Sequence, residues 1–357
     1  MENEKDKNKE KNYLNNNQIN LEFYKTLSSD IFRDNYYNNR ACIFSFHEDN
    51  NIYIVYGIIT LDLECYDLTK EEKFILIKNL HNKSFDSCRH YYDSINIRDF
   101  IITSSLDNHV KIINFKKKES ELILDLNFES KKSIINTAYF VSGKIMVPFS
   151  NINSLGVEYP IFGNVELYDM NFTFIGKFEE NAGFILGLSN YYCKKTKRTY
   201  ILVSNTEGIL SYIVEDLSLY KKFIPKIKDA INGYDESCII EKNEILVLVC
   251  PCFYYEYIHF WDFKSGELIS KMSFDTGISD ICLWNNNYIF ASFNDYNYSQ
   301  MILINTTYNK IEKEYIENSK DSRICGIKIL KHKSKGDFLI SSDLTGNLNL
   351  YKINRNN

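Results

Sequence analysis

Residues that interrupt regular structure are scarce in this sequence, which has only 14 glycines and 4 prolines among 357 residues. It has no run of about 18 apolar residues, the length of a membrane-spanning helix. The first twenty residues are charged and rich in asparagine, without the apolar segment of a secretory signal peptide. We therefore expect a soluble, intracellular protein that is cytoplasmic, with a nuclear location as the alternative.

Neither an excess of positive charge nor a zinc-type cysteine motif is present. The 42 basic and 47 acidic residues give a formal net charge of -5, so we expect no nucleic-acid partner. The nine cysteines form no C-x-x-C pair, and an odd, dispersed set suits a reducing compartment. Cys250 and Cys252 lie in an apolar run, where we expect buried packing in preference to metal binding. No metal or cofactor is expected.

Motifs of catalysis and of phosphate binding are also missing. The chain contains no G-x-S-x-G, G-x-G-x-x-G, G-x-x-x-x-G-K-S/T or H-E-x-x-H pattern. The six histidines, at positions 47, 81, 90, 109, 259 and 332, form no ligand pair visible in the sequence. We interpret the protein as one that is not an enzyme.

Aromatic residues, by contrast, are abundant at 15% of the chain, and they favour β-strands. The stretch DFIITSSLDNHVKIINF (Asp99–Phe115) has an apolar run, a serine pair, an aspartate and a second run that alternates with polar residues. DFLISSDLTGNLNLYKI (Asp337–Ile353) and TYILVSNTEGILSYIVED (Thr199–Asp216) follow the same plan. Each stretch predicts two short strands joined by a tight polar turn.

This pattern recurs along the chain at intervals of roughly 40 to 50 residues, the period of four-stranded propeller blades. Comparable starts fall near Ala41, Phe85, Ile134, Ile185, Ser237, Ile278 and Ile324. The seven units predict an all-β protein with one seven-bladed antiparallel β-propeller over residues 18–357.

The repeats resemble those of the WD40, or β-transducin, superfamily. Trp261-Asp262 is the one copy of the dipeptide for which that family is named. The equivalent places in other units read Ile113-Asn114, Tyr168-Asp169 and Tyr351-Lys352. In the second unit, His81, Ser104 or Ser105, and Asp107 stand where the family keeps a hydrogen-bonded His, Ser and Asp cluster, without the tryptophan that completes it.

The resemblance implies that these residues are structural. A short carboxylate such as Asp107 can accept hydrogen bonds from backbone N–H groups of a tight turn. Asp343 follows a serine pair in the last unit, and we interpret it in the same way. Neither aspartate is expected to be catalytic.

The two ends of the chain are expected to complete the last blade together. The last unit supplies only three strands, while the segment Ile19–Leu27 precedes the first unit without a partner. A closed ring leaves no blade incomplete, so we expect this segment to be the missing outer strand. Residues 1–17 are then a polar tail that we expect to be disordered.

Aromatic residues in three enlarged connections suggest a binding site on one face. The connections, at residues 151–163, 251–257 and 294–299, join the second and third strands of the third, fifth and sixth units. Their aromatic residues are Tyr159, Phe162, Phe253, Tyr254, Tyr255, Tyr296 and Tyr298. Tyrosine is enriched in protein interfaces, so we expect a protein or peptide partner there. The alternative is that these rings pack back on their own blades.

Basic clusters offer a competing hypothesis. They lie at residues 194–198, 221–228 and 331–335, the first and third in connections between first and second strands. Such clusters could contact acidic lipid headgroups or RNA. The F-R-R-G motif of phosphoinositide-binding propellers, a related family, is absent. A solvated, charge-balanced surface is the simpler interpretation, so membrane contact is not expected. The sequence thus predicts a noncatalytic interaction scaffold, a monomeric subunit of a hetero-complex, with a lipid-binding propeller or an enzyme at the central channel as alternatives.

Overall fold

The computed structural model describes most of the chain between Ile19 and Arg355. The described residues are 19–27, 41–58, 60–128, 133–135, 138–151, 162–178, 183, 185–225, 237–242, 244–252, 256–293, 299–317, 324–343 and 346–355. Every regular element within these ranges is a β-strand. No helix in them is long and apolar enough to cross a membrane.

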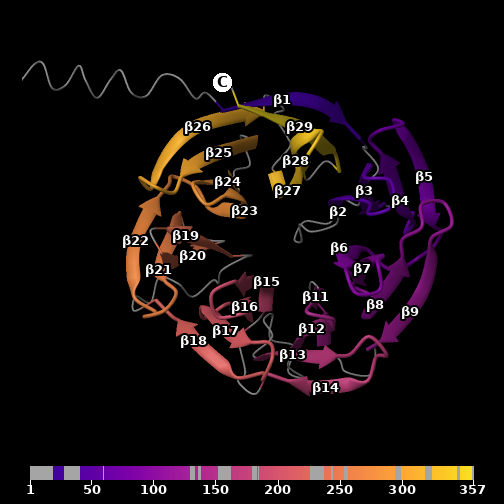
Figure 1. Ribbon diagram of the computed structural model, residues 1–357, viewed down its shortest axis with the longest axis horizontal. Coiled ribbons are helices and arrows are strands. Elements are labelled where there is room, and N and C mark those ends of the chain that lie inside the picture. The colour runs from indigo at the N-terminus through magenta and orange to yellow at the C-terminus, as the bar shows by residue number, and fades with distance from the viewer. Residues whose placement is uncertain are drawn as a thin grey trace, which may run out of the picture.

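The strands form seven antiparallel sheets, the blades, arranged as a ring with the first strand of each blade at the centre (Figure 1). The central strands are β2 (Ala41–Ser45), β6 (Phe85–Asp93), β10 (Ser133–Ile135), β11 (Tyr139–Val141), β15 (Ile185–Cys193), β19 (Cys238–Lys242), β23 (Ile278–Asn285) and β27 (Ile324–His332). The second strands are β3 (Ile52–Gly57), β7 (Arg98–Ser105), β12 (Lys144–Asn151), β16 (Arg198–Asn205), β20 (Ile245–Pro251), β24 (Tyr288–Phe293) and β28 (Gly336–Asp343).

The outer half of each blade completes the ring. The third strands are β4 (Leu63–Asp67), β8 (His109–Asn114), β13 (Phe162–Tyr168), β17 (Ile209–Ile213), β21 (Tyr257–Asp262), β25 (Ser299–Asn305) and β29 (Leu348–Arg355). The rim strands are β5 (Glu72–Ile77), β9 (Glu121–Asn127), β14 (Phe174–Lys177), β18 (Leu219–Phe223), β22 (Leu268–Ser273), β26 (Lys310–Glu317) and β1 (Ile19–Thr26). We number the blades 1 to 7 from β2–β5 onwards. The predicted seven-bladed propeller is confirmed.

The N-terminal strand closes the last blade, as the sequence predicts. β1 pairs antiparallel with β29, from Ile19 opposite Arg355 to Thr26 opposite Asn349, and the two lie together at the rim (Figure 1). Blade 7 is therefore built from both ends of the chain.

Most predicted blade starts coincide with the first residue of a central strand. The third blade differs, because its central position is shared by β10 and β11, which both pair with β12. Ile134 lies within β10 and does not begin it.

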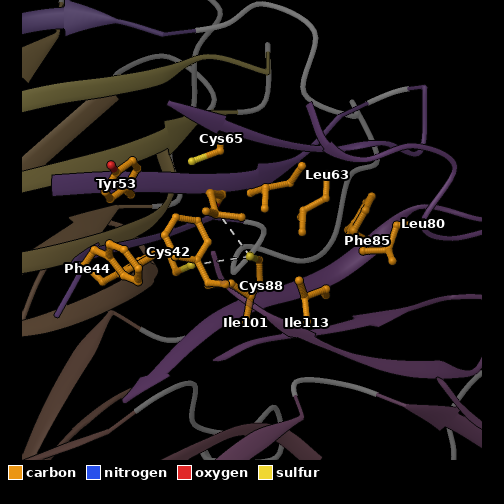
Figure 2. Close-up of a cluster of buried hydrophobic side chains, with 14 residues drawn as sticks. Cys42, Phe44, Tyr53, Leu63, Cys65, Leu80, Phe85, Cys88, Ile101 and Ile113 are labelled. Atoms are coloured by element: carbon orange, nitrogen blue, oxygen red, sulfur yellow. Dashed lines mark hydrogen bonds between the residues drawn. The ribbon is translucent and has the colours of Figure 1, made fainter. Parts of the chain in front are cut away.

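The hydrophobic core consists of seven clusters, each between two neighbouring blades. Strand alternation produces this arrangement, since successive side chains point to opposite faces of a blade. In β7, Ile101 packs toward blade 1, and its neighbours Phe100 and Ile102 pack toward blade 3. Figure 2 shows the cluster between blades 1 and 2. The seventh cluster joins blade 7 to blade 1, so packing as well as strand pairing closes the ring.

Candidate functional site

A buried polar cluster holds the turn between β7 and β8. Nδ1 of His81 lies 3.1 Å from Oδ2 of Asp107, and its Nε2 lies 2.9 Å from Oγ1 of Thr103. Asp107 also accepts the backbone N–H groups of Asn82 at 2.8 Å and His109 at 3.0 Å. One carboxylate thus joins its own turn to the connection between β5 and β6.

The two serines named from the sequence bond elsewhere. The hydroxyl of Ser104 lies 2.7 Å from that of Ser87, and Ser105 donates to the carbonyl of Lys83 at 3.1 Å. The hydroxyl that contacts the imidazole belongs to Thr103, one residue before the serine pair. Strand alternation explains the difference, because Thr103 and Ser104 point to opposite faces of β7.

The protonation states of His81 and Asp107 indicate a structural role for this cluster and not a catalytic one. Burial lowers the pKa of His81, against the opposing effect of Asp107. Burial acts to raise the pKa of Asp107, but His81 and the backbone N–H groups outweigh it and hold that pKa well below its usual range. A neutral His81 therefore donates from Nδ1 to the carboxylate and accepts the Thr103 hydroxyl at Nε2. Both ring nitrogens are occupied.

Asp262 of the family dipeptide caps the turn between β21 and β22. It accepts the backbone N–H groups of Lys264 at 2.9 Å and Ser265 at 2.6 Å. The same acceptor role is played in other blades by Asp67, Asp169 and Asn305. Trp261 is buried beside Phe223. The same turn chemistry thus occurs in blades without a tryptophan before the capping residue.

Asp343 is not the counterpart of Asp107. Ile324 pairs with Asp343 where Phe85 pairs with Ser105, so Asp343 occupies the place of Ser105. The counterpart of Asp107 is residue 345, which lies outside the described residues. Asp343 accepts the backbone N–H of Asn347 at 2.9 Å and therefore caps its own turn.

The aromatic residues predicted to bind a partner lie almost entirely outside the described residues. These are Tyr159, Phe253, Tyr254, Tyr255, Tyr296 and Tyr298. Phe162 is the first residue of β13 and pairs with Asn151, so it belongs to a strand. The second and third strands of blades 3, 5 and 6 are the strands that these connections join, and the strand ends concerned lie on the same face of the ring. The binding role of these residues stays a prediction.

A cavity of about 310 Å³ lies at the centre of the ring. Its walls come from the central strands of blades 1, 2, 3, 4 and 7. Arg89 and Lys328 supply positive charge, and the Arg89 guanidinium lies 4.6 Å from the ring centroid of Tyr139. Asn190 of β15 is exposed on the wall and accepts the hydroxyl of Tyr139 at 3.2 Å. Cationic and aromatic groups therefore face the same space.

A buried carboxylate lies beside this cavity. Asp280 of β23 accepts the backbone N–H of Ile327 at 2.9 Å, and Nζ of Lys328 lies 3.9 Å from it. Burial raises the pKa of Asp280, and the positive charge of Lys328 opposes that effect. The contact joins blade 6 to the central strand of blade 7.

Asp99 lies between two imidazoles. His47 of blade 1 contacts it through Nδ1 and donates its backbone N–H at 3.2 Å, while Nε2 of His90 lies 2.5 Å away. His90 is stacked on Phe44, with ring centroids 4.0 Å apart. Burial acts to raise the pKa of Asp99, but the bonds from His90 and His47 outweigh it and lower that pKa. Both imidazoles are thus directed at one carboxylate.

Two further blade boundaries carry a hydrogen bond at the position of Asp99. Thr199 is the second residue of β16, as Asp99 is of β7, and its hydroxyl lies 3.1 Å from that of Ser142 in blade 3. Asp337 accepts the indole N–H of Trp284 in blade 6 at 2.6 Å. The sequence gives no signal for these bonds, because the partners are about 50 residues apart and belong to different blades.

Seven of the nine cysteines are buried, and Cys238 and Cys282 are partly buried. Cys250 and Cys252 are both buried, and Sγ of Cys252 lies 3.8 Å from Nδ1 of His259. Cys42 and Cys88 meet across blades 1 and 2, with their sulfur atoms 3.6 Å apart (Figure 2). Burial raises the pKa of Cys88, which disfavours a nucleophilic thiolate. Within the described ranges, no group of three or more His, Cys, Asp or Glu residues is placed to hold a metal ion.

Two of the three basic clusters lie on the face opposite to the predicted aromatic site. Residues 194–197 form the turn between β15 and β16, and residues 333–335 form the turn between β27 and β28. Residues 221–223 belong to the rim strand β18, and residues 226–228 lie outside the described residues. Two of the three clusters therefore share one face, three blades apart.

Comparison with known proteins identifies the fold alone. No protein-family model matches the chain, and no curated protein matches it in sequence. A chain in the crystal structure of the mitotic checkpoint complex is similar, with a TM-score of 0.70 and 10% identity over 94% of this chain and 93% of that one. A chain in the structure of BBS1N in complex with ARL6DN has a TM-score of 0.63 and 8% identity, covering 94% of this chain and 97% of that one.

Proposed function

We propose that this protein is a noncatalytic platform for a protein or peptide partner and a divergent WD40-type propeller. The observation that carries the proposal is the central cavity, where Arg89 and Lys328 lie beside tyrosine and histidine rings. Cations bind the carboxylates of a polypeptide, and aromatic rings add apolar contact area and hydroxyl groups. The partner's chemistry is therefore an acidic or aromatic side chain inserted into the channel.

Two further observations support this proposal. The His81, Thr103 and Asp107 cluster and the Asp262 turn use the chemistry of the WD40 resemblance. The two similar structures were both solved as complexes, which is what a platform function predicts of this chain too. The partner would approach from the face of the three aromatic connections, and the protein would act as one subunit of a hetero-complex.

Plugging the cavity tests the proposal. Asn190 is exposed on the cavity wall, so Asn190→Trp should fill the space without disturbing the core. Asn171→Trp is the matched control, because Asn171 is exposed in the turn after β13, away from the channel. Tagged wild-type protein and both variants are purified from the native cells, and bound proteins are quantified by mass spectrometry.

We expect a stoichiometric partner that is recovered with wild type and with Asn171→Trp and is depleted at least about tenfold with Asn190→Trp. The partner is then purified, and its affinity for the three proteins is measured by calorimetry. Equal recovery with the two tryptophan variants, both folded by circular dichroism, would contradict the proposal. Turnover of a small molecule by the purified chain would favour the competing enzyme hypothesis.

A further inference from the structure

Three blades carry the same projecting turn on one face. The central strands β6, β15 and β27 are each nine residues long, and each has a register shift directly after its first residue. They end at Asp93, Cys193 and His332. The turns that follow lie on the face opposite to the aromatic connections, because all blades are antiparallel sheets of the same order.

Each turn is fixed by the last residue of its strand. Asp93 accepts the backbone N–H groups two and three residues later, those of Ile95 at 3.0 Å and Asn96 at 3.3 Å. Nδ1 of His332 accepts the corresponding N–H groups at 3.3 and 3.0 Å. In blade 4, the corresponding N–H groups bond to the Cys193 thiol. The three turns therefore share one rigid geometry.

The fourth residue after the strand end is left-handed in all three turns. Blade 7 places Gly336 there, with φ of 87°, whereas blade 4 uses Lys197 at 54° and blade 2 uses Ile97 at 53°. A β-branched residue is strongly disfavoured in this region. Ile97 is also 61% exposed, and its neighbour Ile95 is 89% exposed. Both side chains are therefore mostly in solvent, in a turn whose backbone is fixed by the bonds to Asp93.

The turns of blades 4 and 7 present positive charge. Their exposed cations are Lys194, Lys195, Lys197, Arg198, Lys331 and Lys333. None of these six forms an ion pair with a carboxylate of the described residues. The lysines of the β8–β9 connection on the same face differ, because Lys116, Lys117 and Lys118 are each paired with a carboxylate. The turns of blades 4 and 7 thus carry exposed cations that form no ion pair among the described residues, unlike the lysines of the β8–β9 connection.

We propose that this face docks on an anionic lipid bilayer. Ile95 and Ile97 would insert among the lipids, and the six cations of blades 4 and 7 would contact headgroup phosphates. Tyr192, 54% exposed directly before the blade 4 turn, adds a side chain suited to the membrane interface. This proposal replaces the expectation from the sequence that membrane contact is absent, and it goes beyond the platform function.

The placement of the turns favours a bilayer over an acidic protein. Blades 2, 4 and 7 are separated by two, three and two steps around the seven-bladed ring (Figure 1). Three rigid points spread around a ring define a plane, which a bilayer surface can contact simultaneously. A peptide would contact one or two neighbouring blades and would not need all three turns.

Vesicle sedimentation tests the proposal with the full chain. One set of vesicles is phosphatidylcholine alone, and the other contains about a quarter phosphatidylserine. The charge variant is Lys194→Ala, Lys195→Ala and Lys197→Ala combined, with Lys78→Ala and Lys83→Ala as its control in the β5–β6 connection on the opposite face. The apolar variant is Ile95→Ser with Ile97→Asn, and its control is Ile123→Ser on the exposed rim strand β9.

We expect the wild type to sediment with anionic vesicles only, and to be released by salt. The charge variant should bind roughly 100-fold more weakly, since each lysine at an anionic surface contributes a factor of about five. The apolar variant should also lose binding, while its melting temperature holds or rises, because asparagine tolerates the left-handed conformation better than isoleucine. Both control variants should bind as the wild type does.

Several results would overturn the proposal. They are absence of binding to anionic vesicles, equal binding to both vesicle types, and a charge variant that binds like its control. Tighter binding of soluble polyglutamate, unaffected by the isoleucine substitutions, would assign the face to an acidic protein instead. Loss of stability in the apolar variant would show that the isoleucines serve folding. None of these results bears on the channel, which Asn190→Trp tests separately.

Discussion

Asp99–Phe115 of blade 2 and Asp337–Ile353 of blade 7 begin alike. Both start with an aspartate in the second strand of the blade, and in both this carboxylate accepts a hydrogen bond from the preceding blade. Asp99 accepts the backbone N–H of His47 in blade 1 and also contacts its ring. Asp337 accepts the indole N–H of Trp284 in blade 6. The shared position gives a shared function.

The second halves of the two stretches differ. Asp107 joins its turn to the connection between blades 1 and 2, whereas Asp343 accepts the backbone N–H of Asn347 within its own turn. The serine pairs that precede them are one residue out of register with each other. A side chain's role is therefore set by its position in the strand pairing and not by the letters around it.

The largest predicted effect on stability follows from the way in which the two blades are assembled from the chain. Blade 2 is a continuous segment, and blade 7 depends on β1. Deleting residues 1–27 removes every hydrogen bond from β1 to β29 and exposes that edge, so unfolding should lose cooperativity or the melting temperature should fall by more than about 10 °C. Deleting residues 1–17 leaves β1 intact and should change little. Equal melting temperatures for the two truncations would refute the role of this pairing.

The next largest difference in stability is expected between substitutions of the first aspartate of each stretch, Asp99 and Asp337. Asp99→Ala leaves two imidazoles without their shared acceptor in a buried site, so we expect a loss of about 3 kcal/mol in the free energy of unfolding. Asp337→Ala removes one bond from a buried indole, so we expect a loss of about 1 to 2 kcal/mol. Urea denaturation of both variants measures the comparison, and a smaller loss for Asp99→Ala would contradict it.

Substituting the second aspartate of each stretch, Asp107 or Asp343, should give a smaller difference in the free energy of unfolding. Asp107→Ala removes the acceptor for two backbone N–H groups and for His81, which should destabilise the protein by about 1 to 3 kcal/mol. Asp343→Ala loses the cap of a single turn and should cost about 1 kcal/mol or less. Chemical denaturation is again the measurement. If the Asp343 variant is the less stable of the two, the assignment of Asp107 to a bond between blades is wrong.

The pH profile should give the smallest effect. His81 has a folded pKa below its usual value of 6.5, so the unfolded chain takes up a proton first as the pH falls through 6.5. Stability is therefore full above 6.5 and declines below it. Asp107, with a lowered pKa, adds stability that is full above its ordinary 3.8 and is lost only as the pH falls further, through its folded pKa.

His81→Gln removes this titration from blade 2. The variant should be less stable at pH 7, and its stability should decline less steeply between pH 6.5 and 4 than that of the wild type. His259 in blade 5 keeps part of the decline, because burial, assisted by Lys271, lowers its pKa to about 4. Urea denaturation at stepped pH measures both slopes. Parallel profiles for wild type and variant would show that His81 is not a titrating group of this kind.

Much of the fold could be predicted from local patterns. Apolar runs bounded by polar turns predict β7 and β28, and the unmatched segment before the first unit predicts the closing strand. The split central strand of blade 3 could not be predicted, because β10 and β11 are each only three residues long. Nor could the role of Thr103, since only pairing with β6 and β8 fixes which neighbour of the serine pair points at His81.

The candidate sites were harder to predict from the sequence than the fold was. Arg89, Tyr139 and Asn190 carry no common motif, and they share a cavity only because three central strands meet around one axis. The projecting turn of blade 2 has Asn96 and no basic residue between Ile95 and Ile97, so the sequence does not mark it as a basic cluster. Its equivalence to the basic turns of blades 4 and 7 depends on backbone geometry, the left-handed residue above all.

The amino-acid order alone determined seven antiparallel sheets and the need for a strand from the chain's beginning to finish the last one. Those features depend on residues a few positions apart, where alternation and turn chemistry act directly. Only the tertiary structure decided which carboxylate binds which blade, what faces the channel and which turns share a surface. Such contacts join residues about 50 positions apart, and their geometry exists only once the ring is closed.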